Sequence, residues 1–199
     1  MTTPELASFA PPGATQGPLQ GPGGVPADGG GRPGAAGGRL SEATKERFAR
    51  EVAKYPPDQA QSAVMACLAI VQREQGWVSA QSEQEVAEFL GMAPIAVHEV
   101  TTFYNMYNQQ PVGRFKINVC TNLPCQLREG QSALDHLCSR LGVEPGGTTP
   151  DGLFTVQQSE CLGACADSPV LLVNDRQMCS FMSENRLDAL VETLKSQAG

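Results

Sequence analysis

The 199-residue chain lacks the long apolar runs of a membrane protein. Its longest such run, Ala63 to Val71, has nine residues, which is too short to cross a bilayer. The N-terminus shows no basic stretch followed by an apolar one, as a secretory signal would. We therefore expect the chain to remain in a reducing compartment without direct membrane insertion. Cysteines in such a compartment favour metal binding or redox chemistry over a disulfide framework.

Positive charge is also scarce, with 14 Lys and Arg against 21 Asp and Glu and a net charge of −7. Acidic chains are repelled by phosphate backbones, so nucleic acid is a poor candidate partner. Residues 82–106 predict helix, glycine-bearing turn and helix, which imitates a DNA-binding helix-turn-helix. No Lys or Arg occurs from Glu74 to Gly113, so that second helix has nothing to offer phosphates or guanines. A DNA-binding module is therefore rejected.

Recognisable catalytic arrangements are missing as well. The chain has no glycine fingerprint for a nucleotide, no Ser–His–Asp set and no paired carboxylates. His98 and His136 each lack a partner at ligand spacing along the sequence. We expect no catalytic residues and no complete active site in this chain alone.

Glycine and proline are abundant, but they are unevenly distributed. Residues 1–38 hold 11 of the 21 Gly and 7 of the 15 Pro, with three charges and one aromatic residue. Such a segment buries too little apolar surface to offset its ordering entropy. We predict a disordered tail over residues 1–40, a helical domain over 41–110 and a second domain over 111–199.

Helical signals dominate residues 41–110. Ser82 and Glu85 have the spacing of a capping box and predict the start of a short helix that ends at Gly91. Pro94 suits the first turn of the next helix, whose apolar positions continue to Tyr107. With two earlier helices, this region is predicted to form a small helical bundle.

The pattern changes after Gly113. Alternating apolar residues predict a strand over 115–120, and a leucine-bearing segment predicts a helix over 126–141. Further strands are expected near 154–156, 170–173 and 177–181, followed by a final helix after Ser183. The second half is thus a compact α/β layer, and the fold class of the whole chain is α+β.

Four of the seven cysteines form two close pairs. Cys120 and Cys125 are separated by four residues, and Cys161 and Cys165 by three. Each pair falls where a predicted strand runs into a loop, so neighbouring loops at one sheet edge could bring four thiolates together. Four thiolates suit zinc or an iron–sulfur cluster. Gly163 leaves room for backbone N–H groups to approach a sulfur.

The other cysteines are interpreted differently. Cys67, Cys138 and Cys179 lie in predicted helices or a strand, where free cysteine usually packs as a small apolar residue. Neither close pair is C-x-x-C, which disfavours thiol–disulfide exchange. If a cluster is present, the acidic chain favours a low reduction potential.

The residues around the second pair resemble a known family. Asp151-x-x-Phe154-Thr155 is followed, after five residues, by Cys161-Leu162-Gly163-x-Cys165-x-x-Ser168-Pro169. This segment is similar to the signature of the 24 kDa subunit of complex I, which is the E subunit of bacterial NADH:quinone oxidoreductase. The stretch 102–107 and the pair Cys120 and Cys125 fit the same family. Ser168 is a departure, because Gly or Ala is expected before that proline.

The resemblance implies a thioredoxin-like [2Fe–2S] ferredoxin domain behind the helical domain. It implies that Cys120, Cys125, Cys161 and Cys165 bind the cluster and ligate its metal. It further implies an electron-transfer subunit of a respiratory NADH dehydrogenase, cytoplasmic and peripheral on the inner membrane. FMN and NADH would be bound by a partner flavoprotein subunit, and a large iron–sulfur subunit would be a second partner.

Subunits of two related enzyme classes share this resemblance. They are the small subunits of NAD-linked formate dehydrogenases and of bidirectional hydrogenases, and the motifs barely distinguish them from the complex I subunit. A more distant alternative is a zinc-stapled interaction module.

Overall fold

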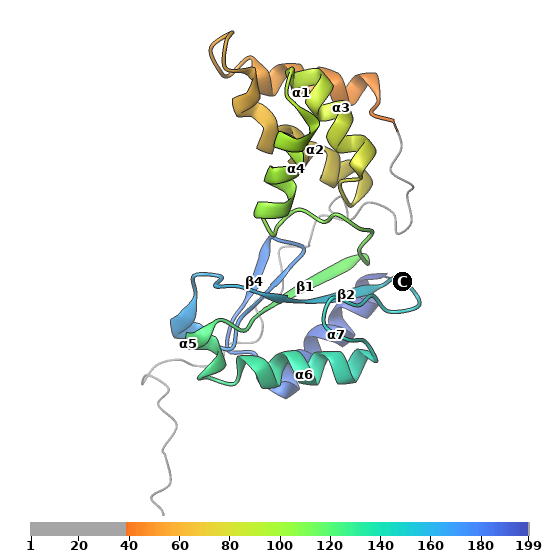
Figure 1. The fold of residues 1–199 in the computed structure, drawn as a ribbon. Helices are drawn as coiled ribbons and strands as arrows, with labels where there is room; N and C mark the ends of the chain where they lie inside the picture. Colours follow the sequence, from red (N-terminus) through yellow and green to blue (C-terminus); the bar gives the residue numbers. More distant parts are fainter. Residues whose placement is uncertain (1–38, 199) are drawn as a thin grey trace, which may run out of the picture.

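The computed structural model describes residues 39–198 (Figure 1). The predicted disorder of the N-terminal tail falls almost wholly outside the described residues. Leu40, at its end, is 6% exposed, and its backbone N–H donates to the Glu85 carboxylate at 2.8 Å. None of the helices described between residues 39 and 198 is long and apolar enough to span a bilayer.

The first part of the described chain is helical, as the sequence predicted. Its helices are α1 (Glu42–Val52), α2 (Val64–Gln75), α3 (Ala80–Leu90) and α4 (Pro94–Phe103), with a 3-10 turn at Ala60–Ala63 before α2. Their apolar stripes bury one shared core that includes Phe48, Leu68, Val86 and Val97. Because each helix is apolar along one side only, the four stabilise one another by packing these sides together.

Two helix boundaries differ from the prediction. The N-cap of α3 is Ser79, whose hydroxyl accepts the Ser82 N–H at 3.1 Å, so the predicted capping box at Ser82 is wrong by three residues. Ser82 lies instead inside the first turn, where its hydroxyl donates to Gln75 at 3.0 Å. Helix α4 ends at Phe103 and does not reach Tyr107, because the chain turns to bury the Tyr107 ring and place its hydroxyl on the Met65 carbonyl at 2.9 Å.

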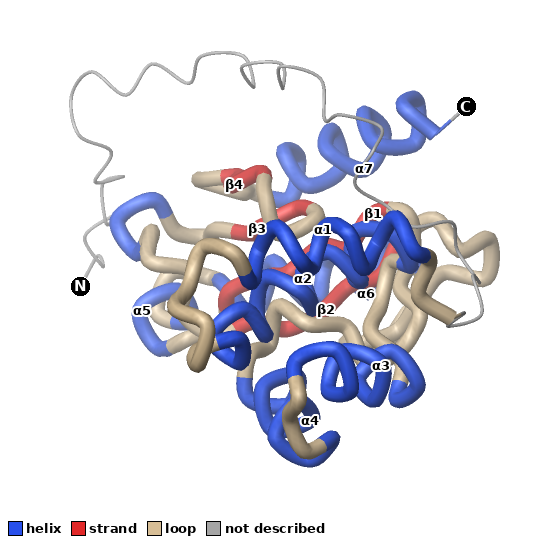
Figure 2. Tube along the Cα trace, turned by 90° about the horizontal axis from the view of Figure 1, so that it is seen from above, coloured by secondary structure: helices blue, strands red, loops and turns tan. Residues whose placement is uncertain are grey.

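The second part is a four-stranded sheet of order β2-β1-β3-β4. The strands are β1 (Phe115–Cys120), β2 (Phe154–Ser159), β3 (Leu171–Val173) and β4 (Gln177–Cys179). Strand β1 pairs parallel with β2 and antiparallel with β3, which pairs antiparallel with β4. The longer helices α6 (Gly130–Leu141) and α7 (Glu184–Ala198) lie together on one side of the sheet, away from α1–α4 (Figure 1). Figure 2, seen from above, shows α1 and α2 in front of the strands.

The predicted helix over 126–141 begins only at Gly130. A short helix, α5 (Leu123–Gln126), is followed by a break at Glu129, which has a left-handed φ of 67°, and then by α6. The break lets the chain change direction beside Cys125. A 3-10 turn, η3 (Cys165–Asp167), precedes β3.

Both faces of β1 are buried, although its residues alternate between apolar and polar. Phe115, Ile117 and Val119 enter the core beneath α6 and α7. Lys116 and Asn118 are 2% and 8% exposed on the opposite face. Lys116 contacts Asn108, in the segment that links α4 to β1, and Asn118 contacts Asp175, in the β3–β4 turn, so an alternating strand is buried throughout.

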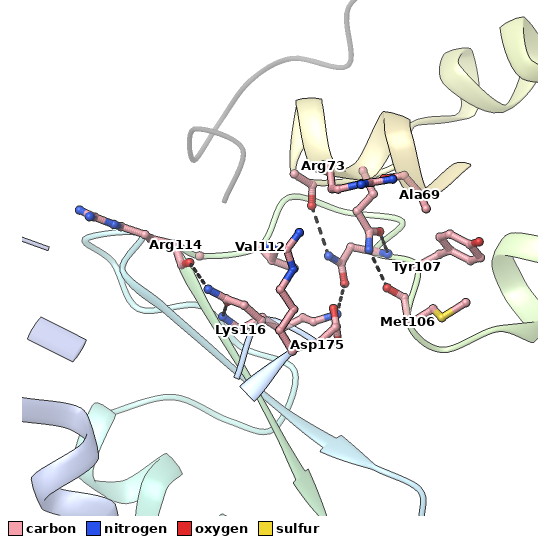
Figure 3. A pocket seen from close by; sticks show the side chains of 14 residues that line it. Ala69, Arg73, Met106, Tyr107, Val112, Arg114, Lys116 and Asp175 are labelled. Carbon is pink, nitrogen blue, oxygen red and sulfur yellow. Dashed lines mark hydrogen bonds and ion pairs between the residues drawn. The ribbon is translucent and has the colours of Figure 1, made fainter. Parts of the chain in front are cut away.

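A polar network joins the helices to the sheet at the start of β1 (Figure 3). The Lys116 ammonium donates to the Asn108 side-chain oxygen at 2.8 Å and to the Asp175 carboxylate at 2.6 Å. The backbone N–H of Asn108 in turn donates to the side-chain oxygen of Gln72, on α2, at 2.6 Å. A cavity of about 210 Å³ lies beside this network, at the opposite end of β1 from Cys120.

Candidate functional site

The parallel pairing of β1 and β2 brings the two cysteine pairs to one end of the sheet. Cys120, the last residue of β1, lies opposite Ser159, the last residue of β2. Cys161 follows two residues beyond β2, and Cys165 begins η3. Cys125 lies on α5, in the loop that leaves β1. The parallel pairing therefore places both cysteine pairs at the same end of the sheet, because carboxyl ends of parallel strands share an edge.

The two pairs differ in their surroundings. Cys120 and Cys125 are each 1% exposed and pack with Val170 in a small apolar cluster. Cys161 is exposed and Cys165 is half-buried, with 3.9 Å between their sulfurs. Within residues 39–198, no three His, Cys, Asp or Glu side chains converge as the ligands of one metal ion would. The site is thus two close thiol pairs, one shielded and one open to solvent.

The thiols influence one another's ionisation. Burial raises the pKa of Cys120, while hydrogen bonds from the backbone N–H groups of Leu162 and Asn122 lower it in part. The hydrogen bond with Cys161 raises the pKa of Cys165, and Cys120 adds to it electrostatically. These effects favour the protonated thiols of Cys120 and Cys165, so a metal would have to displace their protons on binding.

The loops also aim backbone N–H groups at the sulfurs, as predicted for Gly163. Its N–H lies 3.4 Å from the Cys161 sulfur, and its φ of 78° is in the region that favours glycine. Arg128 donates to the Ala166 carbonyl at 2.8 Å, which ties the loop after α5 to η3. The Arg128 hydrogen bond joins the two cysteine-bearing loops independently of the sheet.

Two further residues touch the site and were not predicted to do so. A Cβ on Gly130 would lie 2.7 Å from the Cys120 carbonyl oxygen and 2.8 Å from that of Cys125. Ser168, noted in the sequence only as a departure from a pattern, has its hydroxyl 2.9 Å from the Cys125 sulfur. No sequence signal marks Gly130, because the close approach is made by residues that only the fold brings beside it.

The remaining cysteines are buried, as predicted. Cys67 packs in the helical core, while Cys138 and Cys179 pack in the core of the sheet. The histidines were expected to be isolated, yet each has a carboxylate partner: His98 faces Glu83 and His136 faces Asp188, both at 3.0 Å. These partners come from other helices, which sequence spacing could not reveal.

The fold and the site define an α+β protein that carries two cysteine pairs at one end of its sheet, behind a helical bundle. The model of the thioredoxin-like [2Fe–2S] ferredoxin family matches residues 48–195. The chain belongs to this family, and its membership supports a [2Fe–2S] cluster.

Named relatives cover most of the chain. NADH-quinone oxidoreductase subunit 2 of Thermus thermophilus is 40% identical over 153 residues, which are 76% of this chain and 84% of the relative. A further NADH-quinone oxidoreductase subunit, from Rhizobium meliloti, is 39% identical over 152 residues, which are 76% of this chain and 89% of the relative.

Among solved structures, an NAD⁺-reducing [NiFe]-hydrogenase in its air-oxidized state superposes with a TM-score of 0.60 at 23% identity. The match covers 69% of this chain and 23% of the hydrogenase chain. At that identity, the similarity is one of fold.

Proposed function

We propose that the chain is an electron-transfer subunit of a respiratory NADH:quinone oxidoreductase and that Cys120, Cys125, Cys161 and Cys165 hold its [2Fe–2S] cluster. The observation that carries the proposal is the placement of two cysteine pairs at the same end of the sheet, after parallel β1 and β2. The family supports the cluster, and the names of the relatives support the parent enzyme.

The four cysteine thiols are the kind of ligand that a [2Fe–2S] cluster requires. A [2Fe–2S] cluster takes four thiolates, two on each iron, and the thiols here form two pairs. The N–H groups of Leu162, Asn122 and Gly163 supply partial positive charge to the sulfurs. When bound, the cluster would accept and release one electron, while the chain ligates, shields and positions it.

The two cysteine pairs differ in their exposure to solvent, which gives electron transfer a preferred side. Cys120 and Cys125 are buried, whereas Cys161 is exposed, so electrons would enter and leave from the Cys161 side. Exposed apolar side chains lie on the surrounding loops: Leu123 and Leu127 are 65% and 79% exposed, and Phe181 is 44% exposed. Apolar surface of this kind favours a protein partner close to the site.

That partner is proposed to be a flavoprotein subunit that carries FMN and binds NADH, with a large iron–sulfur subunit also in the assembly. The relatives are named as subunits of an NADH-quinone oxidoreductase, which supports partner subunits of this kind. The chain would then be cytoplasmic and peripheral on the inner membrane. We propose domain limits of 41–110 and 111–199, since each part has its own apolar core.

An equivalent small subunit of an NAD⁺-reducing hydrogenase is the second candidate. The superposition on the hydrogenase chain favours it, although that similarity concerns the fold alone. Both candidates assign the same role to the four cysteines.

Metal analysis of the purified full-length chain tests the cluster. We expect a brown protein with two irons and two acid-labile sulfides, and an EPR signal only after reduction. Cys120→Ala and Cys161→Ala should lower the iron content, whereas Cys138→Ala, a buried cysteine outside the site, should not. A colourless protein with one zinc would contradict the proposal.

The partner is tested at the end of α4, where Phe103 is 78% exposed beside Tyr104, which is 39% exposed. We propose that this exposed aromatic surface contacts the flavoprotein subunit. Phe103→Asp should weaken co-purification with the flavoprotein subunit at unchanged iron content. Tyr55→Asp, on another exposed aromatic residue, is the control. Equal co-purification of both variants would contradict an interface at Phe103.

A further inference from the structure

Ser168 lies between the two cysteine pairs. Its side chain is almost inaccessible, since the residue is 3% exposed. Its hydroxyl oxygen is 2.9 Å from the Cys125 sulfur and 3.0 Å from the Cys165 carbonyl oxygen. The residue therefore touches a member of each pair from a position shielded from water.

The hydroxyl has one proton and two possible acceptors. With a neutral Cys125 thiol, the S–H can donate to the Ser168 oxygen while the Ser168 O–H donates to the Cys165 carbonyl. A metal-bound Cys125 has lost its proton, and its sulfur can only accept. Rotation about the Cβ–Oγ bond then turns the Ser168 O–H from the carbonyl to the negatively charged sulfur.

Such a hydrogen bond acts unequally on the two oxidation states. Reduction adds one electron, and part of the added negative charge falls on the sulfurs. A donor to a ligand sulfur stabilises the reduced form more than the oxidised form, and hydrogen bonds to sulfurs are one determinant of cluster potentials. Burial strengthens the effect, because little water competes for the sulfur.

We propose that Ser168 is a positioning residue that donates a hydrogen bond to the Cys125 thiolate and raises the reduction potential of the cluster. This inference rests on the proposed function, because it requires a cluster on Cys125. Glycine or alanine at this position has no proton to donate. The serine thus opposes the lowering of the potential that the acidic chain favours.

EPR-monitored redox titration of the purified full-length chain tests the proposal. Ser168→Ala should lower the equilibrium constant for one-electron reduction about tenfold, which corresponds to about 59 mV. Ser180→Ala is the matched control, because the Ser180 hydroxyl contacts the Asp167 carboxylate at 3.3 Å and no sulfur. In the wild type, pulsed EPR should detect an exchangeable hydrogen coupled to the cluster that Ser168→Ala lacks.

The outcomes separate the two proposals. A wild-type chain without iron and sulfide would overturn the proposed function itself. If the cluster is present and the reduction potentials of Ser168→Ala and Ser180→Ala are equal, the role of Ser168 is refuted. Loss of the cluster in Ser168→Ala would refute it too, because the proposal assigns Ser168 to the potential and not to cluster retention.

Discussion

Single residues in this protein act mainly through the space they leave and the protons they hold. Gly130 leaves room for two carbonyl groups that belong to Cys120 and Cys125. Cys67, in the other half of the chain, does the reverse: it fills the helical core with a thiol that is kept neutral. The effect of replacing either residue is therefore predicted from the atoms that surround it.

Gly130→Ala should lower the free energy of unfolding by about 1–3 kcal/mol, the usual range for overpacking. Alanine is the better helix former by about 1 kcal/mol, but a methyl group 2.7 Å from backbone oxygen cannot be accommodated by a side-chain rotation. The Cys120 and Cys125 loops must shift, so iron content should fall as well. Urea unfolding and iron analysis measure the two effects.

Gly142→Ala, at the other end of α6, is the control. Gly142 has open space around it and a φ of 67°. An alanine there should lower the free energy of unfolding through backbone strain and leave the iron content unchanged. Iron content in Gly130→Ala equal to that in Gly142→Ala would show that the close approach is unimportant.

Burial, with a smaller effect of Glu51, raises the pKa of Cys67 to about 12, from an ordinary value of 9.0. Above pH 9 the unfolded chain loses this proton while the folded chain keeps it, so the folded state binds more protons and its stability falls as pH rises from 9 to 12. Cys67→Ala should flatten this decline in unfolding experiments at successive pH values. An unchanged slope would mean that Cys67 titrates alike in both states.

Elements begin and end where side chains satisfy their exposed backbone groups. Helix α3 begins at Ser79 because that hydroxyl caps it, although Ser82 and Glu85 offer the same pattern three residues later. Helix α4 ends early because Tyr107 is more stable buried than in a further helical turn. Local patterns thus locate an element, while its exact end depends on which competing contact is made.

The cap at α3 can be tested directly. Ser79→Ala should lower the free energy of unfolding by about 1 kcal/mol, whereas Ser79→Gly should cost only a few tenths. Glycine tolerates the cap position without its hydroxyl, so the difference separates capping from the burial of the side chain. Equal losses in both variants would argue against Ser79 as the cap.

The whole molecule depends on a few polar contacts that hold the helices to the sheet. Lys116 is at their centre, with a side chain 3% exposed that joins Asn108 of the linking segment to Asp175 of the β3–β4 turn. Asp175 also accepts from Asn118 at 2.7 Å, so the carboxylate keeps one partner if Lys116 is removed. The network lies at the opposite end of β1 from Cys120.

Lys116→Met should lower the free energy of unfolding by about 1–3 kcal/mol, since it leaves Asn108 and part of Asp175 unsatisfied. Iron content should not change, because the network is remote from the cysteines. Lys54→Met removes an exposed ion pair with Glu51 and should cost less than about 1 kcal/mol. A Lys116→Met loss no larger than that of Lys54→Met would contradict the role of the network.

The sequence by itself determined the order of the elements and indicated the two cysteine pairs as the candidate site. Apolar spacing is local, so it located the bundle and the strand of Phe115, and two cysteine pairs placed at strand ends indicated a shared site. Only the tertiary structure decided that Gly130 must be small, that Ser168 contacts Cys125, and that Lys116 is buried. These contacts join residues from different elements, and their partners become neighbours only when the chain is packed.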